Sequence, residues 1–169
     1  MPSGGSRRLF AGTAFAVIAL DLVTKFLAEN TLSRVAAIPV IGEWVQLRLV
    51  YNPGAAFGLH LGPYSRWIFL AVAAIAVVVL TRMARAAAPG EVLRQLSLGL
   101  VAGGAFGNLV DRIRSGRGVV DFIDVGVGSL RWPTFNVADI GVSCGAVLLA
   151  ISLWREDARQ QAQAEAASR

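Results

Sequence analysis

Carboxylates are the best candidates for chemistry in this sequence, because the usual nucleophiles and metal ligands are scarce. The chain has one His, His60, and one Cys, Cys144, so a zinc site or a Cys–His nucleophilic pair lacks the necessary residues. A serine nucleophile has no evident base, and we interpret the lone His as an interfacial residue rather than a catalytic base. Paired aspartates are what remains.

Asp121 and Asp139 each lie among apolar residues, within 119–123 and 135–139. Burial in such surroundings raises the pKa of a carboxyl group and favours the protonated form of one member of a pair. Two aspartates held close together share one proton, so the ionised one takes a proton from water while the other donates to a carbonyl oxygen. Such a pair hydrolyses peptide bonds without a metal or a cofactor. The spacing leaves open a simpler interpretation, in which Asp139 only complements a helix dipole.

The elements that must position these aspartates are membrane helices, as the composition indicates. Hydrophobic residues make up 55% of the 169 residues and charged residues 16%, an apolar excess over soluble domains. The high apolar content excludes a disordered chain. The sequence has no Gly-X-Y period, which excludes collagen, and its single Cys excludes a disulfide-stabilised scaffold. The net charge of +5 comes mainly from Arg. Because these arginines are scattered at the edges of apolar runs, we interpret them as helix anchors and not as a nucleic-acid site.

Four apolar runs predict four transmembrane helices, at about 9–28, 65–84, 94–112 and 138–155, with a polar tail at 156–169. The last three runs are short for a hydrocarbon layer of about 30 Å unless their flanks extend them. Arg7 and Arg8 precede the first run as in a signal peptide, but no small-residue cleavage site follows it. We therefore expect an uncleaved span and a single integral membrane domain over 1–169.

A half-buried strand is predicted between the first two spans. Apolar residues stand at positions 45, 47, 49 and 51, a period of two, and the turn-forming sequence 52–54 follows. We expect a small extramembrane β-structured cap at about 35–62. The predicted fold class is therefore an all-α membrane protein, with four transmembrane helices and this cap between the first two.

Alternating spans would gather the carboxylates at one membrane face. The ends of the helices would place Asp21, Asp111 and Asp139 there, and the connection between the third and fourth helices would add Asp121 and Asp124. Seven of the eleven acids would share that face. The 16 basic residues divide equally between the two faces, so the positive-inside rule does not predict the orientation.

Spacing also indicates how the helices are held together. Asp21 and Lys25 are four residues apart and can pair on one helix face, whereas the adjacent Asp111 and Arg112 cannot. Arg112 is therefore expected to pair with a carboxylate elsewhere or with a lipid phosphate. Small residues at helical spacing let backbones approach closely and favour packing of the third helix on the fourth, at Gly99, Gly103, Gly107, Gly141 and Gly145.

Five motifs, taken in order, resemble the lipoprotein signal peptidases, or signal peptidase II. The resemblance extends from about Asp21 to the fourth predicted helix. Pro53 stands where many members of that family carry Thr, which leaves the flanking Asn52 and Gly54 in place. The motifs are DLVTK at 21–25, YNPGAAF at 51–57, GGAFGNLVDR at 103–112, VDF at 120–122 and FNVAD at 135–139.

The resemblance implies a membrane aspartic endopeptidase that removes the signal peptide from prolipoproteins carrying a diacylglyceryl-modified cysteine. It implies Asp121 and Asp139 as the catalytic dyad, and no cofactor, metal or nucleic acid. The resemblance further implies a multi-pass protein of the bacterial inner membrane, with cytoplasmic termini and a site near the periplasmic face. Residues that line or support the site would be Asn52, Gly54, Asn108, Arg112 and Asn136, with Asp21, Lys25 and Asp111 as structural polar partners.

A second function remains compatible with the residues alone. Asp21, Asp111 and Asp139 would form the proton relay of a small ion or proton transporter. Two observations argue against a transporter. The acids cluster at one membrane face, and four short spans leave little room for alternating access.

Overall fold

The computed structural model describes residues 4–54, 61–88 and 90–168. His60 and positions 55–57 of the YNPGAAF motif lie outside the described residues.

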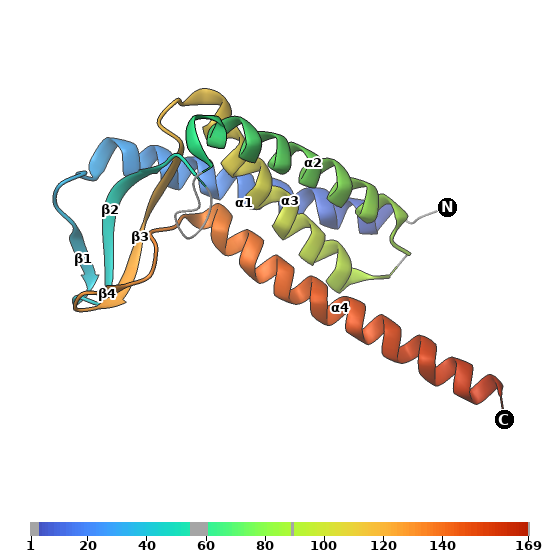
Figure 1. The fold of residues 1–169 in the computed structure, drawn as a ribbon. Coiled ribbons are helices and arrows are strands. Elements are labelled where there is room, and N and C mark those ends of the chain that lie inside the picture. The colour runs from blue at the N-terminus through green and yellow to red at the C-terminus, as the bar shows by residue number, and fades with distance from the viewer. Residues whose placement is uncertain (1–3, 55–60, 89, 169) are drawn as a thin grey trace.

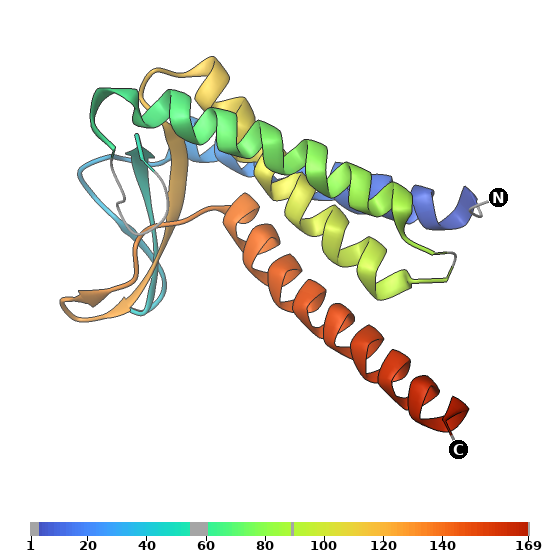
Figure 2. The same cartoon turned by 45° about the vertical axis from the view of Figure 1, so that its right-hand side comes forward.

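Four helices form a bundle with α3 in its middle, where it packs against all three of the others (Figure 1). The helices run beyond the predicted apolar cores, and the last one continues through most of the segment expected to be a polar tail. Both ends of the described chain lie at the end of the bundle opposite the sheet (Figures 1 and 2). The bounds are α1 Gly4–Thr31, α2 Ser65–Ala86, α3 Val92–Arg114 and α4 Val137–Ala167, with a short 3-10 turn at Gly62–Tyr64 before α2.

Three of the described helical segments are long and apolar enough to cross a membrane, at Arg7–Thr31, Gly62–Ala86 and Val137–Ala167. The central helix α3 is not among them. It carries polar side chains such as Gln95 and Ser97, and these are buried against its neighbours. A helix enclosed by others needs less apolar surface than one that faces lipid, so polar side chains are tolerated in α3.

Glycines allow α3 to approach two helices at once. A Cβ at Gly103 would lie 2.8 Å from the carbonyl oxygen of Ala14 in α1, and one at Gly145 would lie 2.9 Å from that of Ser97. Such distances leave no room for a side chain. The predicted packing of α3 on α4 is confirmed at Gly141 and Gly145 of α4. The prediction is wrong for Gly99 and Gly103, which face α1 and not α4.

The antiparallel sheet has the order β1-β2-β3-β4 and lies at one end of the bundle (Figure 1). The predicted strand at 45–51 is confirmed as part of β2. The predicted β-structure between the first two helices is present as β1 and β2, but the sheet is larger than predicted, because β3 and β4 come from the connection between α3 and α4. The bounds are β1 Ile38–Ile41, β2 Val45–Asn52, β3 Val119–Val127 and β4 Leu130–Arg131.

The close contact of α1 with α3 can be tested with one matched pair of substitutions. Gly103→Ala should destabilise the protein, because overpacking costs about 1–3 kcal/mol and outweighs the gain in helix propensity. Gly12→Ala is the control, since a Cβ there meets nothing within 4 Å. Thermal unfolding in detergent should show a lower midpoint for Gly103→Ala alone. Equal midpoints would contradict the proposed packing.

Candidate active site

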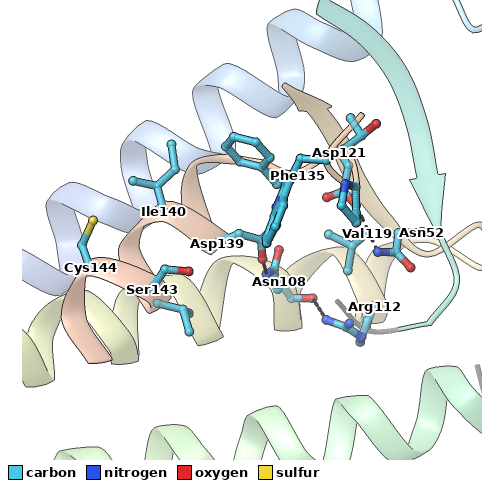
Figure 3. A pocket seen from close by; sticks show the side chains of 14 residues that line it. Asn52, Asn108, Arg112, Val119, Asp121, Phe135, Asp139, Ile140, Ser143 and Cys144 are labelled. Atoms are coloured by element: carbon cyan, nitrogen blue, oxygen red, sulfur yellow. Dashed lines mark hydrogen bonds between the residues drawn. The ribbon is translucent and has the colours of Figure 1, made fainter. Parts of the chain in front are cut away.

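Asp121 and Asp139 reach the same place from different elements. Asp121 lies in β3, opposite Val50 of β2, and Asp139 lies in the first turn of α4. Asp121 was expected in an irregular connection between the third and fourth helices, whereas the structure places it on a strand of the sheet. Figure 3 shows both side chains at the wall of one cavity.

Asn136 connects the two carboxylates. Its Nδ2 donates to Oδ1 of Asp121 at 2.7 Å, and its backbone N donates to Oδ2 of Asp139 at 3.2 Å. Its own Oδ1 accepts from the backbone N of Asp139 at 3.0 Å, which completes a capping box at the start of α4. The side chain is fully buried. Asn136 thus sets the position of both aspartates at once.

Asn52 and Asn108 each hold one of the two aspartates. Asn52 Nδ2 donates to Oδ2 of Asp121 at 3.1 Å, and Asn108 Nδ2 donates to Oδ1 of Asp139 at 2.8 Å. Asn108 cannot turn its amide over, because its Oδ1 accepts from Nζ of Lys25 at 2.9 Å. The two carboxylates are therefore surrounded by oriented amide donors.

Lys25 lies behind this layer as a fully buried cation. Its Nζ is 2.8 Å from Oδ2 of Asp21 and 2.8 Å from Oδ2 of Asp111. The predicted pairing of Asp21 with Lys25 is confirmed. Asp21 also accepts from the backbone N of Ala138, and Asp111 from that of Val120, at 2.9 and 3.2 Å. This cluster joins α1 and α3 to the residues next to both aspartates.

The environment of Asp121 raises the pKa of its carboxyl to about 7. Loss of hydration on burial is the largest cause, and the neighbouring charge of Asp139 acts in the same direction. The amide donors of Asn52 and Asn136 and the charge of Lys25 oppose the rise in pKa. Around neutral pH, Asp121 therefore holds a proton for a large part of the time.

The cavity has a volume of about 460 Å³, and Arg112 of α3 is among the residues that line it. Arg112 donates to the carbonyl oxygens of Asn108 and Gly54, at 3.1 and 2.9 Å. Arg112 forms no ion pair with a carboxylate among the described residues, so that alternative is wrong, and pairing with a lipid phosphate stays a prediction. Gly54 N in turn donates to Oδ1 of Asn52 at 3.0 Å, so this arginine stabilises the turn that carries Asn52.

Sequence reasoning missed much of the cavity wall. The wall includes Trp132, Thr134, Ile140, Ser143 and Cys144, and one face of α4 supplies the last three. Positions 139, 140, 143 and 144 share a helix face, so helical spacing from Asp139 could have identified them. Strand β3 was missed as well, although its run of β-branched residues was a usable signal.

Asp124 is a third carboxylate near the pair in sequence, but it lies elsewhere in space. Its Oδ1 accepts from Nε of Arg131 at 3.0 Å, and it is not among the residues that line the cavity. In the described part of the chain, no group of three or more His, Cys, Asp or Glu side chains is arranged to hold a metal ion.

Comparisons with known proteins all lead to one family. The profile of the family described as signal peptidase (SPase) II matches residues 13–155. The lipoprotein signal peptidase of Syntrophotalea carbinolica is 40% identical over 92% of this chain and 96% of its own length. That of Rhodococcus jostii is 44% identical over 86% of this chain and 72% of its own. A solved bacterial membrane enzyme superposes with a TM-score of 0.80 at 28% identity, covering 94% of this chain and 93% of the other.

The buried lysine provides a test of how the site is held together. Lys25→Met leaves two carboxylates buried without their cation, which should cost about 3–5 kcal/mol of stability. Arg117→Met is the control, because the Arg117 side chain is 60% exposed and its ion pair with Glu29, at 3.7 Å, should be worth at most about 1 kcal/mol.

Thermal unfolding in detergent measures both substitutions. Adding Asp21→Asn and Asp111→Asn to Lys25→Met should recover part of the lost stability, because no uncompensated charge then remains in the cluster. The interpretation is wrong if Lys25→Met unfolds at the same temperature as Arg117→Met.

Proposed function

Because the chain belongs to the signal peptidase II family, we propose that Asp121 and Asp139 are its catalytic dyad. The family match covers most of the chain, and the chain is an aspartic-type membrane peptidase that cleaves the signal peptides of prolipoproteins. The observation that carries the assignment of the dyad is that one buried side chain, Asn136, hydrogen-bonds to Asp121 while its backbone holds Asp139.

Asp139 is the base of the proposed reaction. It accepts hydrogen bonds from Nδ2 of Asn108 and from the backbone N of Asn136, so its carboxylate is held in a fixed orientation at the cavity wall. It lies in the first turn of α4. The ionised carboxylate takes a proton from a water molecule, whose oxygen attacks the scissile carbonyl carbon.

Asp121 is the corresponding acid. With a pKa near 7, its carboxyl holds a proton at neutral pH and donates it to the carbonyl oxygen as the tetrahedral intermediate forms. When the C–N bond breaks, the proton held by Asp139 goes to the leaving amine, and Asp121 recovers its proton from the collapsing intermediate. Water is consumed, and a carboxyl and an amine are formed.

The cavity fits a substrate that is both peptide and lipid. Asn52, Asn108 and the two aspartates form its polar end, and Ile140, Val142 and Phe135 contribute apolar surface. We place the scissile peptide at the polar end and the diacylglyceryl group along α4, where its acyl chains remain in contact with lipid. The scissile part of the signal peptide must be extended there, because a helix hides its carbonyl groups.

The arrangement of the helices and the sheet also supports a proposed membrane topology. All four helices cross the membrane, with α3 shielded by the other three, and the sheet and the dyad lie at one surface. By analogy with the family, that surface is periplasmic, the termini are cytoplasmic, and the membrane is the bacterial inner membrane. The alternative of an Asp relay for proton transport is not supported, because Asp21 and Asp111 are held by Lys25.

Substitution of the dyad tests the assignment directly. Asp121→Asn and Asp139→Asn should each abolish cleavage of a diacylglyceryl-modified prolipoprotein by the purified protein in detergent, because neither amide can transfer the proton. Asp124→Asn is the matched control on the same strand and should retain activity. Folding of each variant is checked by thermal unfolding. Near-normal turnover by either dyad variant would remove that residue from the dyad.

The pH dependence of cleavage tests the role of Asp121. Below its pKa of about 7 the carboxyl is protonated and can act as the acid, so kcat/KM should fall as pH rises through about 7. Asn52→Leu removes a donor that stabilises the carboxylate, so it should move this alkaline limb to higher pH. Gln46→Leu, on the same strand, should leave the limb in place. If the alkaline limb of the pH profile stays in place or moves to lower pH in Asn52→Leu, a group other than Asp121 is responsible for it.

A further inference from the structure

A second hollow lies at the end of the bundle opposite the sheet. It has a volume of about 370 Å³ and lies between the start of α3, at 90–94, and the outer half of α4. Its α4 wall is one helix face, formed by Ser152, Arg155, Glu156, Arg159, Gln160 and Gln163. In Figure 2 this half of α4 diverges from α3 and extends beyond the rest of the bundle. The proposed peptidase reaction does not use this hollow.

The two acidic groups of the hollow share one arginine as their ion-pair partner. Arg94 places its Nη1 3.4 Å from Oε2 of Glu91 and 3.1 Å from Oε2 of Glu156. Arg155 and Arg159 are exposed, and neither forms an ion pair with any described residue. Two arginines without an ion-pair partner among the described residues thus lie one helical turn apart on the wall, and the three arginines and two glutamates of the lining leave a net positive charge.

The position of the hollow along α4 indicates where an anion would come from. Between Asp139 and Arg155 the helix carries no charged residue, so Arg155 is the first charge after the apolar span. Trp154, 73% exposed, stands beside it, and tryptophan is typical of the membrane–water interface. The hollow therefore lies at the level of lipid headgroups.

We propose that this hollow binds the phosphate group of an anionic phospholipid. Guanidinium groups match phosphate oxygens with paired hydrogen bonds, and basic pockets between transmembrane helices are suited to acidic headgroups. The volume exceeds that of a single water, about 30 Å³, by roughly tenfold, which leaves room for a headgroup. Arg155 and Arg159 hold the phosphate, and the acyl chains lie along the apolar part of α4.

Lipid binding is measured on the full-length protein in detergent, without reference to peptidase activity. Phosphatidylglycerol should raise the thermal unfolding midpoint of the unsubstituted protein and should remain bound in native mass spectrometry, whereas phosphatidylcholine should do neither. Arg155→Gln/Arg159→Gln should lose at least half of the midpoint shift and most of the bound lipid. The matched control is Arg82→Gln/Arg85→Gln, which removes the same charge from α2 at the same end, outside the residues that line the hollow.

Three outcomes would overturn the proposal. Equal retention of phosphatidylglycerol by both double variants would show that the lipid binds through general charge. Equal protection by inorganic phosphate would assign the site to the free anion and not to a lipid. Equal protection by phosphatidylcholine would show that the headgroup charge plays no part. Arg155→Lys/Arg159→Lys keeps the charge and should retain part of the binding if the pocket selects an anion.

Discussion

The buried ammonium group of Lys25 is the interaction on which the site depends. A lone cation in this position would be strongly unfavourable, so it requires the two carboxylates of Asp21 and Asp111 and the amide oxygen of Asn108. Those partners come from two helices, and each of the three also hydrogen-bonds to a residue at or next to the aspartate pair. The need to neutralise one charge therefore fixes the helix ends, the start of α4 and the beginning of β3 together.

From this cluster outward, the polar groups of the site are linked in layers. Lys25 orients Asn108, and Asn108 holds Asp139, while Asn136 connects Asp139 to Asp121. Each amide has a defined orientation because its oxygen and nitrogen have different partners. The result is a site in which two like charges lie close together and one of them takes up a proton, a condition useful for a peptidase and unfavourable for stability.

The central place of α3 has consequences at both ends of the bundle. At the sheet end, α3 supplies Asn108, Asp111 and Arg112 to the aspartate site. At the other end, its first turn forms one wall of the hollow beside Arg155 and Arg159. Polar residues are tolerated along α3 because its neighbours cover it, and its glycines allow that covering to be close. One helix thus connects a reactive surface with a proposed lipid-binding surface.

Local pattern was enough to predict the helices, strand β2, the ion pair of Asp21 with Lys25 and the close packing of α4 on α3 at Gly141 and Gly145. All of these depend on spacings of two to four residues, which the sequence displays directly. The family motifs likewise indicated Asp121 and Asp139 as candidates.

Only the tertiary structure placed β3 beside β2 and brought Asn52 to Asp121, Lys25 to Asp111 and Asp21 to the start of α4. Asn52 and Asp121 are 69 residues apart, and Asp21 and Ala138 are 117 apart. No periodic pattern specifies contacts across such distances, because they follow from how the helices pack and how two separate connections meet in one sheet. By itself, the sequence determined which groups could react, whereas the packing decided which of these groups touch.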